Sequence, residues 1–272
     1  MVTVYCALYP EAQELICTYH LKKETDRQHF QVFSSEDKAF RLVVTGVGLS
    51  AAVAVAEIST MYPPKDTDFL VNFGSCGGCG FSLEEVYLCN KIVDAAGGRT
   101  FYPDILYRHP FSEAEITSFS RPQEHGAFPN GILCDMEAAT VYQSGSYYYS
   151  THQMVFLKVV VDDGVAGKVS VREFGKQMKT GTARVTGFLD RLREISDLNG
   201  DRKAEQLFPA WILEEFHGSK TMQAKLCQML RYFELTGTDY ETLLNGYRRS
   251  GRLPCDKQEG KKILEELKSR LF

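Results

Sequence analysis

MVFLKVVVDD, residues 154–163, is the stretch that decides the fold class of this chain of 272 residues. Its run of β-branched and other apolar residues predicts a long strand that is buried on both faces. The next segment outward, residues 170–195, predicts a helix that returns along the sheet. Further strands are predicted at residues 2–8, 30–35, 40–48 and 84–94, with helices at 10–20 and 49–62. Residues 68–78 predict a strand that enters a glycine turn at its end. This alternation predicts an α/β fold, a mixed and mainly parallel sheet flanked by helices on both faces.

The end of the chain has a different pattern. From about residue 197 the β signal vanishes, and several segments have helical spacing, most of them followed by a glycine. The polar stretch SDLNGDRK, residues 196–203, joins the two parts. We therefore expect an α/β domain at residues 1–196 and a small all-helical C-terminal module of unknown role at residues 197–272.

Composition excludes several classes of protein. The chain is 44% hydrophobic with a formal net charge of −4, which is ordinary for a globular protein and argues against a nucleic-acid binder that relies on bulk charge. No apolar run approaches the roughly 20 residues of a membrane span. The first residues do not have the pattern of a secretion signal, so we expect a cytoplasmic protein.

The cysteines favour thiols over a metal site. Cys76 and Cys79 form a CxxC, but a zinc site needs two further ligands at suitable spacing, and the sequence has no second pair. The two residues are therefore interpreted as ordinary thiols in a glycine-rich turn, and no metal site is expected.

One glutamate has no simple structural explanation. In GILCDMEAATVYQ, residues 131–143, Asp135 is suited to cap a helix, but Glu137 lies among apolar residues, where an unpaired charge is costly to bury. Other polar residues follow predicted strands. These are Glu11, the glycines Gly46 and Gly48, the group Asn72, Gly74 and Ser75, and the pair Asp162 and Asp163.

Each of these features alone has an ordinary explanation as a helix-end charge or a tight turn. Ligands of α/β sheets, however, bind near the carboxyl ends of the strands. Glu11, Glu137 and Asp162 would then meet at one rim of the sheet, where carboxyl pKa values can be moved apart.

The motifs together resemble those of the nucleoside phosphorylase superfamily, most closely its methylthioadenosine/S-adenosylhomocysteine nucleosidase branch. The likeness covers residues 1–195. It rests on ALYPEAQEL (7–15), VTGVGLSAA (44–52), VNFGSCGG (71–78), DMEAATVYQ (135–143) and KVVVDDG (158–164), which occur in the family's order. The resemblance implies a phosphorylase/hydrolase-like mixed sheet and a purine nucleoside or thionucleoside as substrate.

The resemblance also implies roles for individual residues. Glu137 would accept hydrogen bonds from the ribose hydroxyls, with Met136 packed against the sugar. Asp162, or with less support Asp163, would protonate the leaving purine at N7, and Glu11 would activate the attacking water. The other residues implied to line the site are Ser75, Gly46, Gly48 and Asn72. No metal or organic cofactor is implied, and the family implies a homodimer or larger assembly.

Hydrolysis is favoured over phosphorolysis. The first turn contains Glu11 in place of a phosphate-binding Gly-Asp-Pro turn, and Asn72 stands where a phosphorylase has an arginine. A carboxylate near the nucleophile repels a phosphate dianion. The alternative is a phosphate-dependent purine nucleoside phosphorylase, in which Arg99 and Arg108 would supply the anion site.

A catalytically impaired nucleoside-binding sensor is the remaining alternative. Val161 replaces the family's serine before the aspartate, and residues 112–133 form a short, irregular segment where the family has a longer one that stacks on the base. Phe119 or Phe128 would have to do the stacking. The base and the 5′ substituent therefore stay open.

Overall fold

The computed structural model describes residues 1–25, 29–123, 130–162, 169–200, 226, 229–230, 239–251 and 256–268. The chain divides into two compact units, Met1–Asp201 and Arg202–Phe272, which are described separately.

The first unit is built on a ten-stranded sheet with the order β10-β6-β8-β9-β5-β1-β4-β3-β2, in which β7 pairs with β6. The strands are β1 (Val2–Cys6), β2 (Lys22–Lys23), β3 (Gln31–Ser34), β4 (Phe40–Val44), β5 (Phe69–Gly78), β6 (Val86–Asp94), β7 (Thr100–Phe101), β8 (Ser112–Ser118), β9 (Leu133–Asp135) and β10 (Met154–Asp162). Because β10 also pairs with β5, strands β5, β9, β8, β6 and β10 form a closed ring.

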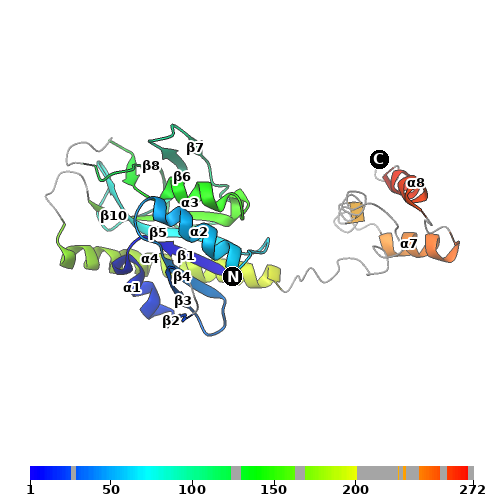
Figure 1. Ribbon diagram of the computed structural model, residues 1–272, viewed down its shortest axis with the longest axis horizontal. Coiled ribbons are helices and arrows are strands. Elements are labelled where there is room, and N and C mark those ends of the chain that lie inside the picture. The colour runs from blue at the N-terminus through cyan, green and yellow to red at the C-terminus, as the bar shows by residue number, and fades with distance from the viewer. Residues whose placement is uncertain are drawn as a thin grey trace. The chain divides into compact units, whose positions relative to one another are not determined.

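Helices cover both faces of this sheet, as Figure 1 shows. They are α1 (Tyr9–Thr18), α2 (Leu49–Met61), α3 (Ala138–Gly145) and α4 (Val171–Gly200), with a 3-10 turn at Thr151–Gln153. The apolar side chains form two clusters. One joins α1 and α4 to the sheet, and the other joins α2 and α3 to it. Since each cluster buries alternate residues of the central strands, these strands need apolar residues at nearly every position.

The pairing is mixed, as expected. Strand β1 is parallel to β4 and β5, β5 is parallel to β10, and β8 is parallel to β6 and β9. The other pairs, β10–β6, β2–β3, β3–β4, β5–β9 and β6–β7, are antiparallel. The predicted fold class, a mixed α/β sheet with helices on both faces, is confirmed.

Three local predictions differ from the structure. The glycine-rich end of β5 continues as a strand to Gly78, because β10 and β9 supply hydrogen-bonding neighbours there. The segment expected to be irregular begins with β8, whose buried Ala114 and Ile116 alternate with more exposed residues. Helix α4 extends to Gly200, past its predicted end at residue 195 and into the stretch expected to be a linker.

The second unit contains two described helices of ten residues or more, α7 (Tyr240–Arg249) and α8 (Lys257–Lys268). Asp239 caps α7, because its side chain accepts a hydrogen bond from Thr242 N at 3.0 Å. Among the described residues, the buried apolar side chains are Leu244 and Tyr247 on α7 and Leu264 and Leu267 on α8. Within the described parts of the chain, no helix combines the length and the apolar character that a membrane crossing requires.

Candidate active site

The Glu11 carboxylate is held in one orientation. Glu11 lies in the first turn of α1 and is 2% exposed. Its Oε2 accepts a hydrogen bond from Leu8 N at 3.0 Å, and its Oε1 accepts two from Ser75, from N at 2.8 Å and from Oγ at 2.6 Å. Strand β1 last pairs with β5 at Tyr5 and Asn72. Beyond that point, Glu11 supplies the acceptor that Ser75 N would otherwise lack.

Gly74 lets the Glu11 carboxylate lie against the backbone of β5. A Cβ at Gly74 would lie 3.1 Å from both Oε1 and Oε2 of Glu11, closer than ordinary contacts. Gly74 is also the register partner of Lys158 on β10. The Glu11 carboxylate and Lys158 therefore flank the same position of β5.

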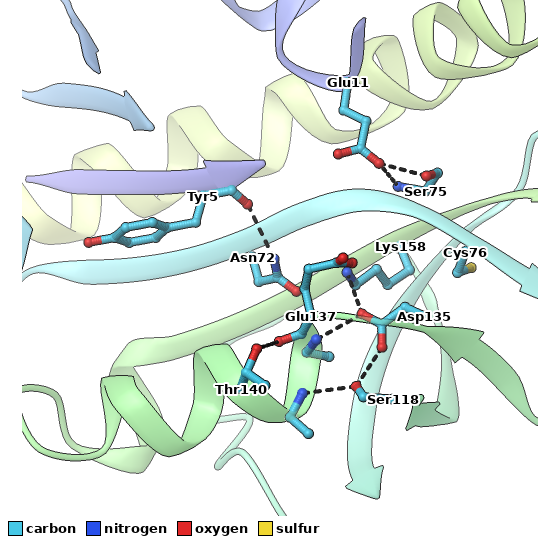
Figure 2. Close-up of polar contacts among 12 residues, drawn as sticks. Tyr5, Glu11, Asn72, Ser75, Cys76, Ser118, Asp135, Glu137, Thr140 and Lys158 are labelled. Atoms are coloured by element: carbon cyan, nitrogen blue, oxygen red, sulfur yellow. Dashed lines mark hydrogen bonds and ion pairs between the residues drawn. The ribbon is translucent and has the colours of Figure 1, made fainter. Parts of the chain in front are cut away.

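Lys158 forms a buried ion pair that the sequence reasoning missed. Its Nζ lies 2.8 Å from Asp135 Oδ2, and both side chains are 1% exposed. Asp135 Oδ2 also accepts from Ala138 N at 2.8 Å, while Oδ1 accepts from Ser118 Oγ at 2.5 Å. Figure 2 shows Asp135 between Lys158 and Ser118. Asp135 thus bonds the first N–H of α3, although the N-cap residue of this helix is Glu137 and not Asp135 as the sequence suggested. It also neutralises a buried ammonium.

The ammonium of Lys158 is surrounded by carboxylates. Burial lowers the pKa of Lys158, but Asp135, Glu137 and Glu11 raise it, and the net shift is upward. The signal in the sequence was a single lysine inside the otherwise apolar run of β10, where an isolated charge is very costly to bury.

Glu137 lies at the start of α3, where the sequence placed it among apolar residues. It is 7% exposed, and its Oε1 accepts a hydrogen bond from Gly48 N at 2.9 Å. Burial raises the pKa of Glu137. Lys158 and the Gly48 N–H act in the opposite direction, whereas Asp135 and Glu11 raise it further. Glu137 and Glu11 are therefore close enough to interact electrostatically.

The Gly46 and Gly48 turn joins β4 to α2 and directs the N–H of Gly48 at Glu137. Both glycines have positive φ, +77° and +69°, a conformation that residues with a side chain rarely adopt. Gly46 N donates to Ala7 O at 2.9 Å, which fixes the turn to the end of β1.

Asp162 ends β10 and is half-buried. Its register partner on β5 is Gly77, which in turn pairs with Cys134 on β9, one residue before Asp135. Strand β5 therefore lies between Asp162 on β10 and Asp135 on β9. Asp163, the less favoured candidate, lies outside the described residues, as does Phe128.

Asn72 faces the second cluster of the core. It is 3% exposed, and its Nδ2 donates to Tyr5 O at 3.2 Å. Its buried Oδ1 has no hydrogen-bond partner within the described residues. The hydrogen bond to Tyr5 of β1 therefore orients the amide, while Oδ1 accepts no hydrogen bond from the described residues.

A cavity of about 900 Å³ opens beside α2 and α3. Two residues of the predicted site, Gly48 and Met136, line it, together with Phe119 and Arg99. Among the described residues, Glu11, Glu137 and Asp162 do not line this cavity. The cavity therefore adjoins the predicted site at Gly48, which donates a hydrogen bond to Glu137, and at Met136, which precedes Glu137 in the chain.

The CxxC cysteines do not lie together in a turn. Cys76 is buried in β5, and burial raises the pKa of its thiol, whereas Cys79 follows the strand. Within the described residues, no group of three or more His, Cys, Asp or Glu side chains is placed to hold a metal ion.

The fold, with its closed ring of strands inside a mixed sheet, is that of the methylthioadenosine/S-adenosylhomocysteine nucleosidases of known structure, so the resemblance stated from the sequence is confirmed at the level of the fold. No protein-family model matches the chain, and no curated protein matches it either.

Three solved structures illustrate the likeness. The apo 5′-methylthioadenosine nucleosidase of Arabidopsis thaliana has a TM-score of 0.57 and 18% identity, over 72% of this chain and 95% of that one. The Neisseria meningitidis nucleosidase with methylthio-immucillin-A has a TM-score of 0.54 and 20% identity, over 73% and 98%. The Colwellia psychrerythraea nucleosidase with adenine has a TM-score of 0.55 and 17% identity, over 71% and 94%.

Proposed function

We propose that the chain hydrolyses the N-glycosidic bond of a purine nucleoside or thionucleoside. The observation that carries this proposal is the Glu11 carboxylate, fixed against Gly74 of β5 and electrostatically coupled to Glu137 through the buried cluster around Lys158. The known nucleosidases with this fold include proteins solved with adenine and with methylthio-immucillin-A, which supports a purine or thionucleoside substrate.

Glu11 is proposed as the general base. An ionised carboxylate has about four acceptor positions, and the described hydrogen bonds from Leu8 and Ser75 use three of them. The remaining position would accept a hydrogen bond from a water molecule. As the oxygen of that water forms its bond to the ribose C1′, Glu11 would take up the proton.

Asp162 and Glu137 complete the proposed reaction. Asp162 would donate a proton to the purine N7 while the bond between C1′ and the base breaks, so that the base does not leave as an anion. Glu137 would accept hydrogen bonds from the ribose hydroxyls, with Met136 against the sugar. Ser75, Asn72 and the turn of Gly46 and Gly48 would lie around the bound nucleoside.

The charges of the cluster favour water over phosphate as the nucleophile. Glu11, Asp135 and Glu137 supply three carboxylates, whereas Lys158 supplies one ammonium, which is already paired with Asp135. A phosphate dianion would meet uncompensated negative charge. Of the two arginines named for the phosphorylase alternative, Arg99 lines the cavity and Arg108 does not, so a phosphorylase mechanism that used this cavity would use Arg99.

The deciding experiment is a substrate screen with and without phosphate. The protein is incubated with methylthioadenosine, adenosylhomocysteine, inosine and adenosine, and base release is followed by chromatography. We expect release without phosphate. Release that requires phosphate would assign a phosphorylase, and binding without release from any nucleoside would assign the sensor.

We also propose a homodimer or a larger assembly. The described apolar side chains at the mouth of the cavity include Leu49 and Tyr147, which are 77% and 86% exposed. Such side chains suit burial against a second copy of the chain. Light scattering after gel filtration should give at least twice the 30.7 kDa of the chain, and a monomer mass would reject this part of the proposal.

A further inference from the structure

The buried ion pair of Lys158 and Asp135 calls for an explanation beyond packing. The neighbours of Lys158 along β10, Leu157 and Val159, are apolar and fully buried. A buried ion pair is often no more stabilising than apolar residues of similar volume, because both charges must leave water. A core built for stability alone could therefore hold an aliphatic side chain at position 158.

We propose that Lys158 is a positioning residue of the candidate site: its ammonium, paired with Asp135, fixes the start of the helix that carries Glu137 and supplies a positive charge to the carboxylates around it. This inference rests on the proposed function in one respect, since the ionised Glu137 would be the acceptor for the ribose hydroxyls.

The first half of the inference concerns charge. Four groups face Glu137 from different elements: Lys158 on β10, Asp135 on β9, Glu11 on α1 and the Gly48 N–H before α2. Burial and the two carboxylates favour the protonated form of Glu137. Lys158 exerts the strongest opposing effect, larger than that of either carboxylate or of the Gly48 N–H. A protonated Glu137 would lose part of its capacity to accept hydrogen bonds from two hydroxyls.

The second half concerns position. Asp135 Oδ2 is shared between Lys158 Nζ and Ala138 N, each at 2.8 Å. Asp135 Oδ1 accepts from Ser118 Oγ, which itself accepts from Ala139 N at 2.9 Å. The first two N–H groups of α3 are thus tied to β9, β8 and β10, as Figure 2 shows for the labelled residues. Glu137 directly precedes these N–H groups, so its backbone is fixed by the same network.

The test is a titration of Glu137 by carbon-13 NMR of its carboxyl carbon in the full chain without ligand, with the signal assigned by its loss in Glu137→Gln. The variant Lys158→Gln/Asp135→Asn replaces the ion pair by a neutral hydrogen-bonding pair. We expect the pKa of Glu137 to rise in it, because the effect of Lys158 exceeds that of Asp135. In Asp135→Asn alone the same pKa should fall, and in Lys158→Arg it should stay near that of the wild type.

These opposite directions separate an electrostatic role from a structural one. A Glu137 pKa that is unchanged in both neutralised variants, or that moves the same way in both, would overturn the inference. If Lys158→Gln/Asp135→Asn does not fold, as judged by near-UV circular dichroism, Lys158→Met/Asp135→Asn gives the same comparison with an aliphatic chain of similar length.

Nucleoside binding gives a second readout. Affinity for methylthioadenosine at a given pH should fall about tenfold for each unit by which the Glu137 pKa exceeds that pH. A wild-type protein that binds no nucleoside would reject the proposed function, and the NMR titration alone would then decide the role of Lys158.

Discussion

The carboxylate of Glu11 occupies the space that a side chain on Gly74 would need, at 3.1 Å from the position of the absent Cβ. Gly74 is not among the glycines with positive φ, so its backbone conformation is open to other residues. Glycine suits this position because a Cβ would force the neighbouring carboxylate to move by a few tenths of an ångström. Gly46 and Gly48 differ, because their positive φ angles impose glycine through the backbone itself.

Gly74→Ala should lower kcat by about tenfold to 10²-fold with a smaller change in KM. The added methyl group would force the Glu11 carboxylate to move by a few tenths of an ångström, away from its position against the attacking water, and small misplacements of a catalytic group can cost that much. Steady-state kinetics with the substrate found in the screen measures this. The matched control is Gly187→Ala on α4, where a Cβ meets nothing within 4 Å. Equal kinetics in the two variants would contradict the proposed role of Glu11.

Glu11→Gln should lower kcat by about 10² to 10⁴ while nucleoside binding persists, because an amide cannot accept the proton of the attacking water. Glutamine keeps an oxygen that can accept from Ser75 N, so the fold should be retained. Calorimetric binding beside single-turnover kinetics separates the two effects. Glu14→Gln, on the same helix, is the control. A Glu11→Gln enzyme with wild-type turnover would remove Glu11 from the mechanism.

The sequence predicted those helices and strands whose pattern is local, that is, set by residues close together in the chain. Strand β1 and helix α1 follow from a local apolar run and a local helical pattern, and β10 follows from nine residues that are nearly all apolar. The end of β5 was predicted as a turn from its glycines. That prediction was wrong because the strand is held by β9 and β10, which are distant in sequence.

The candidate site shows the same limit. The pattern of residues drew attention to Glu11, Glu137 and Asp162, and the structure places Glu11 and Glu137 in one electrostatic cluster. The sequence pattern did not reveal the pairing of Lys158 with Asp135, because that contact joins β10 to β9 across β5. The sequence also did not predict the cavity beside Met136, since the residues that line it come from α2, α3, the ends of β6, β7 and β8, and several loops.

Asp162→Asn should lower turnover by at least about 10²-fold with the fold intact, because an amide cannot protonate the purine N7. The loss should be smaller for a substrate whose base is a better leaving group and needs less protonation. Asp163→Asn is the comparison variant. A fully active Asp162→Asn together with an inactive Asp163→Asn would show that the acid is the second aspartate.

Glu137→Gln should change the pH dependence of stability in a defined direction. In the folded protein, burial raises the pKa of Glu137 above its ordinary value of 4.5, so the native state holds this proton more tightly than the unfolded state does. The Glu137 contribution to the free energy of unfolding is therefore fully present below pH 4.5 and is lost as the pH rises through the raised pKa. Glutamine does not titrate.

The difference in unfolding free energy, Glu137→Gln minus wild type, should accordingly grow with pH across that window and level off above it. Urea unfolding at a series of pH values between about 4 and 8 measures the difference, with Glu14→Gln as a variant expected to show no such trend. The same Glu137→Gln protein should have a raised KM for the nucleoside, because one acceptor of the ribose hydroxyls becomes a donor. A stability difference that shrinks with rising pH would mean that Lys158 and the Gly48 N–H outweigh burial, and an unchanged KM would separate Glu137 from the sugar.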